Sequence, residues 1–127
     1  MNLRQTALYV SRVRVGLGVM MVASPKLAFG PIFGAGVTEP GPAAVGRMMG
    51  AREAALGVGA AIAVGERRGS ANWISMVAMA DGLDAVINLV SPRLGWRGRT
   101  LGVVAAVSAA AHLMLAQQLA RDVDASG

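Results

Sequence analysis

Apolar residues fill four long stretches of the chain, and polar or Pro- and Gly-rich segments separate them. Each stretch has roughly 20 residues, the length that an α-helix needs to cross a bilayer. Pro25 and Pro92 end the first and third stretches, because the residue before a proline disfavours helix. The pattern predicts an all-α fold, an integral membrane four-helix bundle. The expected spans are residues 5–24, 42–64, 71–91 and 100–119.

The connections between the expected spans differ in character. Residues 65–69 and 92–99 form short polar turns that are rich in arginine. Residues 25–41 are rich in proline and glycine but also apolar, as at Phe29 and Phe33, and predict a longer loop. This loop either lies on the lipid headgroups or forms a re-entrant cap over an internal cavity. Residues 120–127 are expected to be a frayed polar tail.

Composition supports a single membrane domain over residues 1–127. Hydrophobic residues make up 54% of the chain and charged residues 15%, whereas a soluble domain is about 25% charged. The absence of cysteine excludes disulfides, thiolate metal sites and cysteine nucleophiles. The net charge of +5 indicates arginine at lipid headgroups, since few aromatics accompany it. We therefore expect membrane lipid as a partner and no nucleic acid.

The N-terminal stretch resembles a signal peptide, with arginines before an apolar run and a possible cleavage site near Ser24. Pro25 would follow the cut directly, where proline is poorly tolerated, and more apolar spans come after it. The first stretch is therefore predicted to be a retained membrane helix.

Charged residues occur inside the predicted spans, where they are costly. At about 1.5 Å per helical residue, Arg12, Arg14, Arg52, Glu53, Asp81 and His112 all fall near the bilayer midplane. A lone ionised side chain there costs about 2.5–3.5 kcal/mol on insertion scales. We therefore expect these groups to pair inside the bundle as one nearly neutral layer, with Arg52 opposite Asp81 and Arg12 or Arg14 opposite Glu53. The residues expected in or beside this layer are Arg12, Arg14, Arg47, Arg52, Glu53, Asp81, Asp84, Asn88, Ser108 and His112.

Two interpretations of this layer stay open. It is either a buried ion-pair network that fixes helix register, or a polar pocket or proton path. Asp81, Asp84 and Asn88 share one helical face, which should therefore point inward. The candidates for acid–base chemistry are Asp81, Asp84, Glu53 and His112.

His112 is the only histidine, which excludes a multi-histidine metal site or bis-histidine haem. Ser108 and His112 are i, i+4 neighbours without a nucleophile-elbow pattern, so they do not indicate a catalytic triad. No glycine-rich phosphate loop is present, and we expect neither a metal nor a cofactor.

Gly46 and Gly50 form a small-xxx-small pair in the second span. Such a pair lets another backbone approach closely, either within this chain or from a second copy as a homo-oligomer.

Several short motifs together resemble small bacterial four-helix membrane proteins of the DoxX-like kind or related families of unassigned function. They are R-V-G-L-G at Arg14–Gly18, S-P-K-L at Ser24–Leu27, G-R-M-M-G-A-R-E-A-A-L-G at Gly46–Gly57 and D-G-L-D at Asp81–Asp84. The resemblance implies a four-helix protein of the bacterial inner membrane. Some relatives are linked to quinone-coupled redox or act as accessory membrane subunits, but no catalytic residues can be carried over.

Positive charges inform the orientation of the predicted spans. Arg4, Arg67, Arg68 and Arg121 fall on one side, and Lys26, Arg93, Arg97 and Arg99 on the other. The count is tied unless Arg12 and Arg14 are added to the first side, which favours both termini in the cytoplasm.

Three functional hypotheses follow. The first is a non-enzymatic membrane protein that binds or helps move a small apolar or amphipathic molecule, or is an accessory subunit of a membrane complex with another membrane protein as its partner. The second is a membrane-embedded acid–base enzyme, isomerase- or cyclase-like, on a lipid-like substrate. The third is a purely structural homodimer through Gly46 and Gly50.

Overall fold

In a computed structural model, which describes residues 2–92 and 94–124, the chain is almost entirely helical. Helices α1 (Leu3–Ala23), α3 (Pro40–Glu66), α4 (Ser70–Val90) and α5 (Trp96–Asp124) are each long and apolar enough to cross a membrane. Between α1 and α3 lie α2 (Pro25–Phe33) and the 3-10 turn η1 (Ala35–Thr38). The described ranges contain no strand, and the prediction of an all-α fold with four helices long and apolar enough to span a membrane is confirmed.

Local hydrogen bonds explain where the first helix begins and how it is tied to the third. Asn2 caps α1: its side chain accepts from Gln5 N and its own N–H donates to the Gln5 side chain, both at 2.9 Å. Arg4 reaches across to the end of α3 and donates to the carbonyls of Val64 at 3.0 Å and Gly65 at 2.5 Å. These carbonyls have no partner within their own helix at its end, so Arg4 acts as a cap.

The loop predicted for residues 25–41 is wrong, because most of it is helical. Pro25 occupies the first turn of α2, where its missing N–H costs nothing, and the Ser24 side chain accepts from Leu27 N at 3.4 Å. Gly34, at a φ of 80°, ends α2 in a conformation that favours glycine.

The polar tail is also corrected in part, since α5 continues through residues 120–124. Residues 125–127 of that predicted tail, and Arg93 of the second polar turn, lie outside the described residues.

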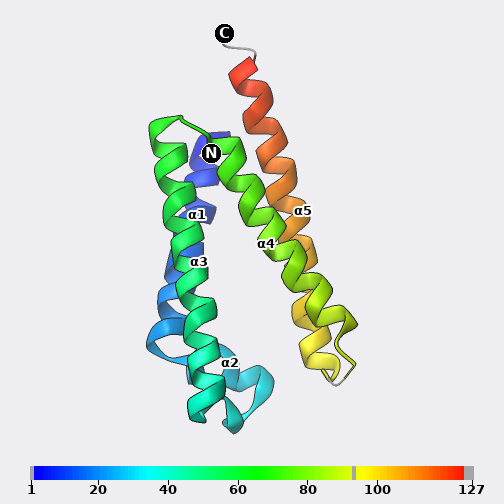
Figure 1. Cartoon of the computed structure of the whole chain (residues 1–127). Coiled ribbons are helices and arrows are strands. Elements are labelled where there is room, and N and C mark those ends of the chain that lie inside the picture. The colour runs from blue at the N-terminus through cyan, green and yellow to red at the C-terminus, as the bar shows by residue number, and fades with distance from the viewer. Residues whose placement is uncertain (1, 93, 125–127) are drawn as a thin grey trace.

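The helices form two pairs, as Figure 1 shows: α1 packs along α3, and α4 packs along α5. The two pairs meet mainly where α3 approaches α4, and α2 lies at the end of the bundle opposite the chain termini. Both described ends of the chain lie at the same end of the bundle, as four spans require.

Glycines allow the backbones of α1 and α3 to touch. A Cβ on Gly50 would lie 2.6 Å from the Cβ of Met21, and one on Gly57 would lie 2.8 Å from the carbonyl oxygen of Ser11. Gly46 packs against the ring of Phe29: a Cβ on Gly46 would lie 3.1 Å from the Phe29 ring. Gly46 and Gly50 therefore serve a close approach within the chain. A homo-oligomer through them stays a prediction.

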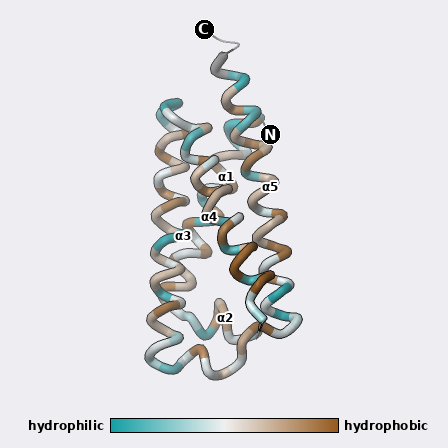
Figure 2. Tube along the Cα trace, turned by 45° about the vertical axis from the view of Figure 1, so that its right-hand side comes forward, coloured by the Kyte–Doolittle hydropathy of each residue, from teal (hydrophilic) through white to brown (hydrophobic). Residues whose placement is uncertain are grey.

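The side-chain distribution differs from that of a soluble protein in the number of large apolar residues at the surface. The buried hydrophobic cluster combines alanines such as Ala7 and Ala60 with larger side chains such as Ile74, whereas other large apolar side chains such as Leu83 and Met114 are about 60% exposed. Arg14 and Asp81, by contrast, are buried. Figure 2 shows hydrophobic positions distributed along all the long helices. The structure is that of a small multi-pass membrane protein with a buried charged network.

Candidate functional site

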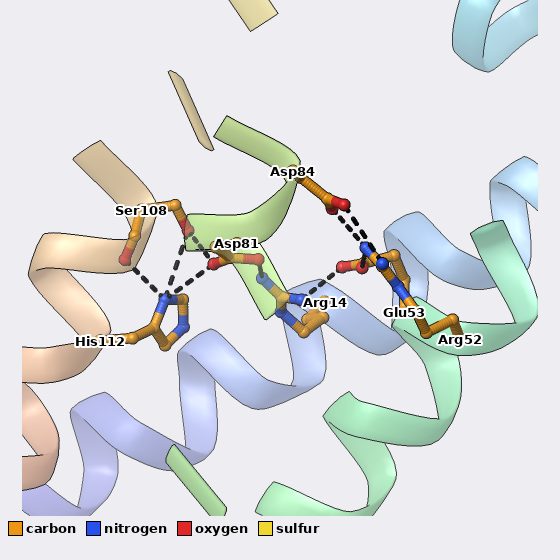
Figure 3. Close-up of polar contacts among 7 residues, drawn as sticks. All are labelled: Arg14, Arg52, Glu53, Asp81, Asp84, Ser108 and His112. Carbon is orange, nitrogen blue, oxygen red and sulfur yellow. Dashed lines mark hydrogen bonds and ion pairs between the residues drawn. The ribbon is translucent and has the colours of Figure 1, made fainter. Parts of the chain in front are cut away.

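Charged and polar side chains from all four long helices meet in one network (Figure 3). The sequence predicted this meeting from helical depth alone. We call these side chains the charged network. Its members are Arg14 from α1, Arg52 and Glu53 from α3, Asp81 and Asp84 from α4, and Ser108 and His112 from α5.

Arg14 lies at the centre of the charged network. Its Nη1 donates to Glu53 Oε2 at 2.5 Å and its Nη2 donates to Asp81 Oδ1. Only 10% of the Arg14 side chain is exposed, so both ion pairs are shielded from the surroundings. Because Glu53 belongs to α3 and Asp81 to α4, this one guanidinium links the two helix pairs. The predicted pairing of Arg14 with Glu53 is confirmed.

Arg52 forms the outer edge of the charged network. Its two terminal nitrogens bind both carboxylate oxygens of Asp84, one at 3.2 Å, and Nη2 also lies 3.1 Å from Glu53 Oε1. The predicted pair between Arg52 and Asp81 is wrong. Asp84 lies three residues, about 4.5 Å, beyond Asp81 on α4, and Arg14 already binds the Asp81 carboxylate.

The opposite end of the charged network is on α5. Ser108 Oγ donates to Asp81 Oδ2 at 2.7 Å. The His112 Nδ1 atom lies 2.8 Å from the carbonyl oxygen of Ser108 and 3.3 Å from Asp81 Oδ2. The order of contacts is therefore Asp84, Arg52, Glu53, Arg14, Asp81 and then the Ser108–His112 pair.

Three predicted members of the layer lie elsewhere. Arg12 and Arg47 are exposed and form no ion pair within the described residues. Arg12 precedes Arg14 by two residues, which is about 200° around the helix, so the two cannot face the same way. Asn88 donates to the carbonyl oxygen of Asp84 in its own helix at 2.7 Å.

The predicted charge balance of the layer changes as a result. Without Arg12 and Arg47, two arginines face the carboxylates of Glu53, Asp81 and Asp84. The charged network therefore carries one net negative charge while His112 is neutral. This net charge disfavours an anion beside the charged network.

A pocket adjoins each end of the charged network. The first, which we call the α2 pocket, has a volume of about 800 Å³ and lies between α2, η1 and α3 on one side and α4 and α5 on the other. Arg52 and Asp84 line it. The second, the α5 pocket, has a volume of about 600 Å³, lies between α1 and α5, and includes His112 in its wall. Both volumes are in the range of small-molecule sites, about 300–1,000 Å³.

Two of the four acid–base candidates line the two pockets described above. Asp84 lines the α2 pocket and His112 the α5 pocket, whereas Glu53 and Asp81 both bind Arg14 in the interior. Within residues 2–92 and 94–124, no group of three or more His, Asp or Glu residues could hold a metal ion.

Sequence reasoning missed the wall that α2 and η1 contribute to the α2 pocket. Phe29 and Phe33 of α2 and Val37 of η1 line it. The available signal was the apolar character of the Pro- and Gly-rich segment. Whether residues 25–41 lie on the lipid headgroups or re-enter the membrane stays a prediction.

No protein-family model, no curated protein and no solved structure matches this chain.

Proposed function

We propose that this protein binds an amphipathic molecule in the α2 pocket, with a neutral hydrogen-bonding head at the Arg52–Asp84 pair. The observation that carries the proposal is the position of this ion pair. It joins the buried charged network to the wall of a large and otherwise mainly apolar pocket.

The polar end of the α2 pocket suits a hydroxyl or amide head. Arg52 offers donors and Asp84 offers carboxylate acceptors, side by side and held by their mutual contact. A hydroxyl can accept from the first and donate to the second. Glu39 also lines the pocket. Together, Glu39, Arg52 and Asp84 give the pocket one net negative charge, which disfavours an anionic head group.

The rest of the α2 pocket suits an apolar chain. Phe29, Phe33 and Leu101 provide apolar surface, and Val45 and Ile87 line the pocket while remaining more than half exposed. In a multi-pass membrane protein, exposed apolar side chains of spanning helices face lipid. A chain can therefore enter sideways from the bilayer without crossing a polar surface.

Photolabelling in lipid nanodiscs tests this function. The probe is a long-chain alcohol that carries a diazirine in its chain, and the labelled residues are mapped by mass spectrometry. We expect saturable labelling at the α2 pocket. Ile87→Trp fills the pocket and should abolish the saturable part. Val86→Trp is the matched control, because Val86 is equally exposed on the same helix but does not line the pocket.

The outcomes are distinct. Equal loss in both tryptophan variants would mean that bulk on α4, not the pocket, controls labelling. Labelling that rises linearly with probe concentration in the wild-type protein would mean that the alcohol only partitions into lipid. Either result contradicts the proposed function.

The proposal places the protein in a bacterial inner membrane with both termini in the cytoplasm, in keeping with the resemblance to DoxX-like proteins. Because the chain has no cysteine, single cysteines report orientation directly. Glu66→Cys, at the end of α3, should be protected from a membrane-impermeant maleimide in intact cells. Trp96→Cys, at the start of α5, should react. The opposite pattern would reverse the orientation without affecting the pocket.

A further inference from the structure

The α5 pocket holds a polar atom that the charged network does not use. His112 is buried, with 7% of its surface exposed, and all of its polar contacts to described residues are made through Nδ1. The other ring nitrogen, Nε2, has no hydrogen bond there, and Figure 3 shows it on the side of the ring turned away from Asp81 and Ser108. A buried histidine with one free nitrogen is a candidate ligand contact.

The partners of Nδ1 determine the chemistry of Nε2. The carbonyl oxygen of Ser108, at 2.8 Å, and the carboxylate of Asp81, at 3.3 Å, can only accept hydrogen bonds. The third neighbour of Nδ1, Ser108 Oγ at 3.3 Å, donates its own hydrogen to Asp81 Oδ2 at the shorter distance of 2.7 Å. Nδ1 must therefore carry the hydrogen. In the neutral imidazole, Nε2 then has a lone pair and acts as an acceptor.

Nε2 can be reached from the pocket. Within the described residues, every fully buried nitrogen or oxygen atom of a side chain has a hydrogen-bond partner. Since Nε2 has none, it is not fully buried, and the cavity that the imidazole lines is the α5 pocket. The remaining wall is mainly apolar, with Val10, Leu115 and Met114. Gln118, about 9 Å along α5 from His112, and Thr6 supply polar groups toward the membrane surface.

We propose that the α5 pocket is a second binding site, for a compact and mainly apolar molecule whose hydroxyl group donates a hydrogen bond to His112 Nε2. A hydroxyl is favoured over an anion because the adjoining charged network is already negative by one charge. An ordinary lipid keeps its head at the membrane surface and its chain at depth, so its hydroxyl does not reach His112. A compact alcohol or phenol can do so. Asp81 and Ser108 act as positioning residues, since they hold the imidazole in the tautomer that accepts.

The single histidine makes this site directly observable. In protein labelled with ¹⁵N-histidine in lipid nanodiscs, the imidazole spectrum should show the neutral form with hydrogen on Nδ1. Titration with 4-butylphenol should shift the Nε2 resonance saturably. The matched probe 4-butylanisole replaces the hydroxyl hydrogen with a methyl group. It should bind about tenfold more weakly, the loss of one well-placed hydrogen bond, and should leave the Nε2 resonance in place.

Two variants separate pocket binding from partitioning into lipid. Met114→Trp fills the α5 pocket and should abolish the saturable shift. Leu113→Trp places the same bulk on an exposed neighbour outside the pocket and should retain it. Ile87→Trp, which fills only the α2 pocket, should also retain the saturable shift of the Nε2 resonance. Failure of binding at the α5 pocket is therefore distinguishable from failure of the function proposed for the α2 pocket.

Four results would overturn the inference. They are hydrogen on Nε2 in the free neutral ring, a doubly protonated ring at neutral pH, equal shifts with the phenol and the anisole, and an unchanged titration in Met114→Trp.

Discussion

Arg14 and Glu53 form a salt bridge at 2.5 Å midway between two places where α1 and α3 touch through glycine. On one side of the bridge, Gly50 packs on the Gly18 carbonyl, and on the other, Gly57 packs on the Ser11 carbonyl. The glycines bring the helices close enough for the charges to meet, and the charges hold the helix rotation that keeps the glycines facing α1. Small-residue packing and ion pairing therefore support each other at this interface.

Removal of the central guanidinium should destabilise the bundle. Arg14→Gln leaves Asp81 without its arginine and Glu53 with Arg52 alone, and breaking a buried ion pair on one side costs about 3–5 kcal/mol. Unfolding by SDS in mixed micelles measures the loss. Arg12→Gln, on an exposed arginine two residues away, should change stability by no more than about 0.5 kcal/mol. Similar losses in the two variants would contradict a central role for Arg14.

Glycine substitutions in α1 and α3 should have opposite effects. An alanine at Gly57 would place its Cβ 2.8 Å from the Ser11 carbonyl, so Gly57→Ala should cost about 1–3 kcal/mol through overpacking. Gly16→Ala meets nothing within 4 Å and should gain about 0.5–1 kcal/mol from helix propensity. The same SDS titration compares them. A neutral Gly57→Ala would show that the two backbones are not in contact.

Asp84→Asn should change the preference of the α2 pocket for head groups. The substitution removes a negative charge beside Arg52, whose remaining partner is Glu53, so the pocket becomes more positive by one charge. Saturable labelling by a diazirine-bearing fatty acid should increase several-fold, whereas labelling by the matching alcohol should not increase. Glu39→Gln makes the same charge change without releasing Arg52. If both variants raise labelling equally, net charge and not the ion pair controls the preference.

The existence of the charged network could be predicted from the sequence, because apolar stretches set the four helices and helical rise sets depth. Depth placed Arg14, Glu53, Asp81 and His112 in one layer, and the structure joins them. Depth does not specify which way a side chain faces around its helix. Depth therefore predicts Arg12 in the layer as well, although it lies about 200° around the helix from Arg14.

The pockets could not be predicted, because they depend on how the two helix pairs separate. The composition of the Pro- and Gly-rich segment predicts a loop, because composition does not distinguish a proline in a loop from a proline at the first position of a helix. Only the three-dimensional position of α2, at the end opposite the termini, shows that Phe29 and Phe33 form a pocket wall.

A double variant separates the contribution of the Arg14–Asp81 pair from the cost of an unpaired charge. Arg14→Gln leaves Asp81 buried without its cation, and Asp81→Asn leaves the Arg14 guanidinium with Glu53 as its only carboxylate partner. In the double variant no charge is orphaned, because Glu53 still has Arg52 and the new amides can hydrogen-bond to each other. The double variant should therefore be no less stable than Arg14→Gln alone, with a coupling of about 0.5–3 kcal/mol between the two sites. Unfolding by SDS of all four proteins gives this coupling, and additive losses would mean that Arg14 and Asp81 do not stabilise the bundle as a pair.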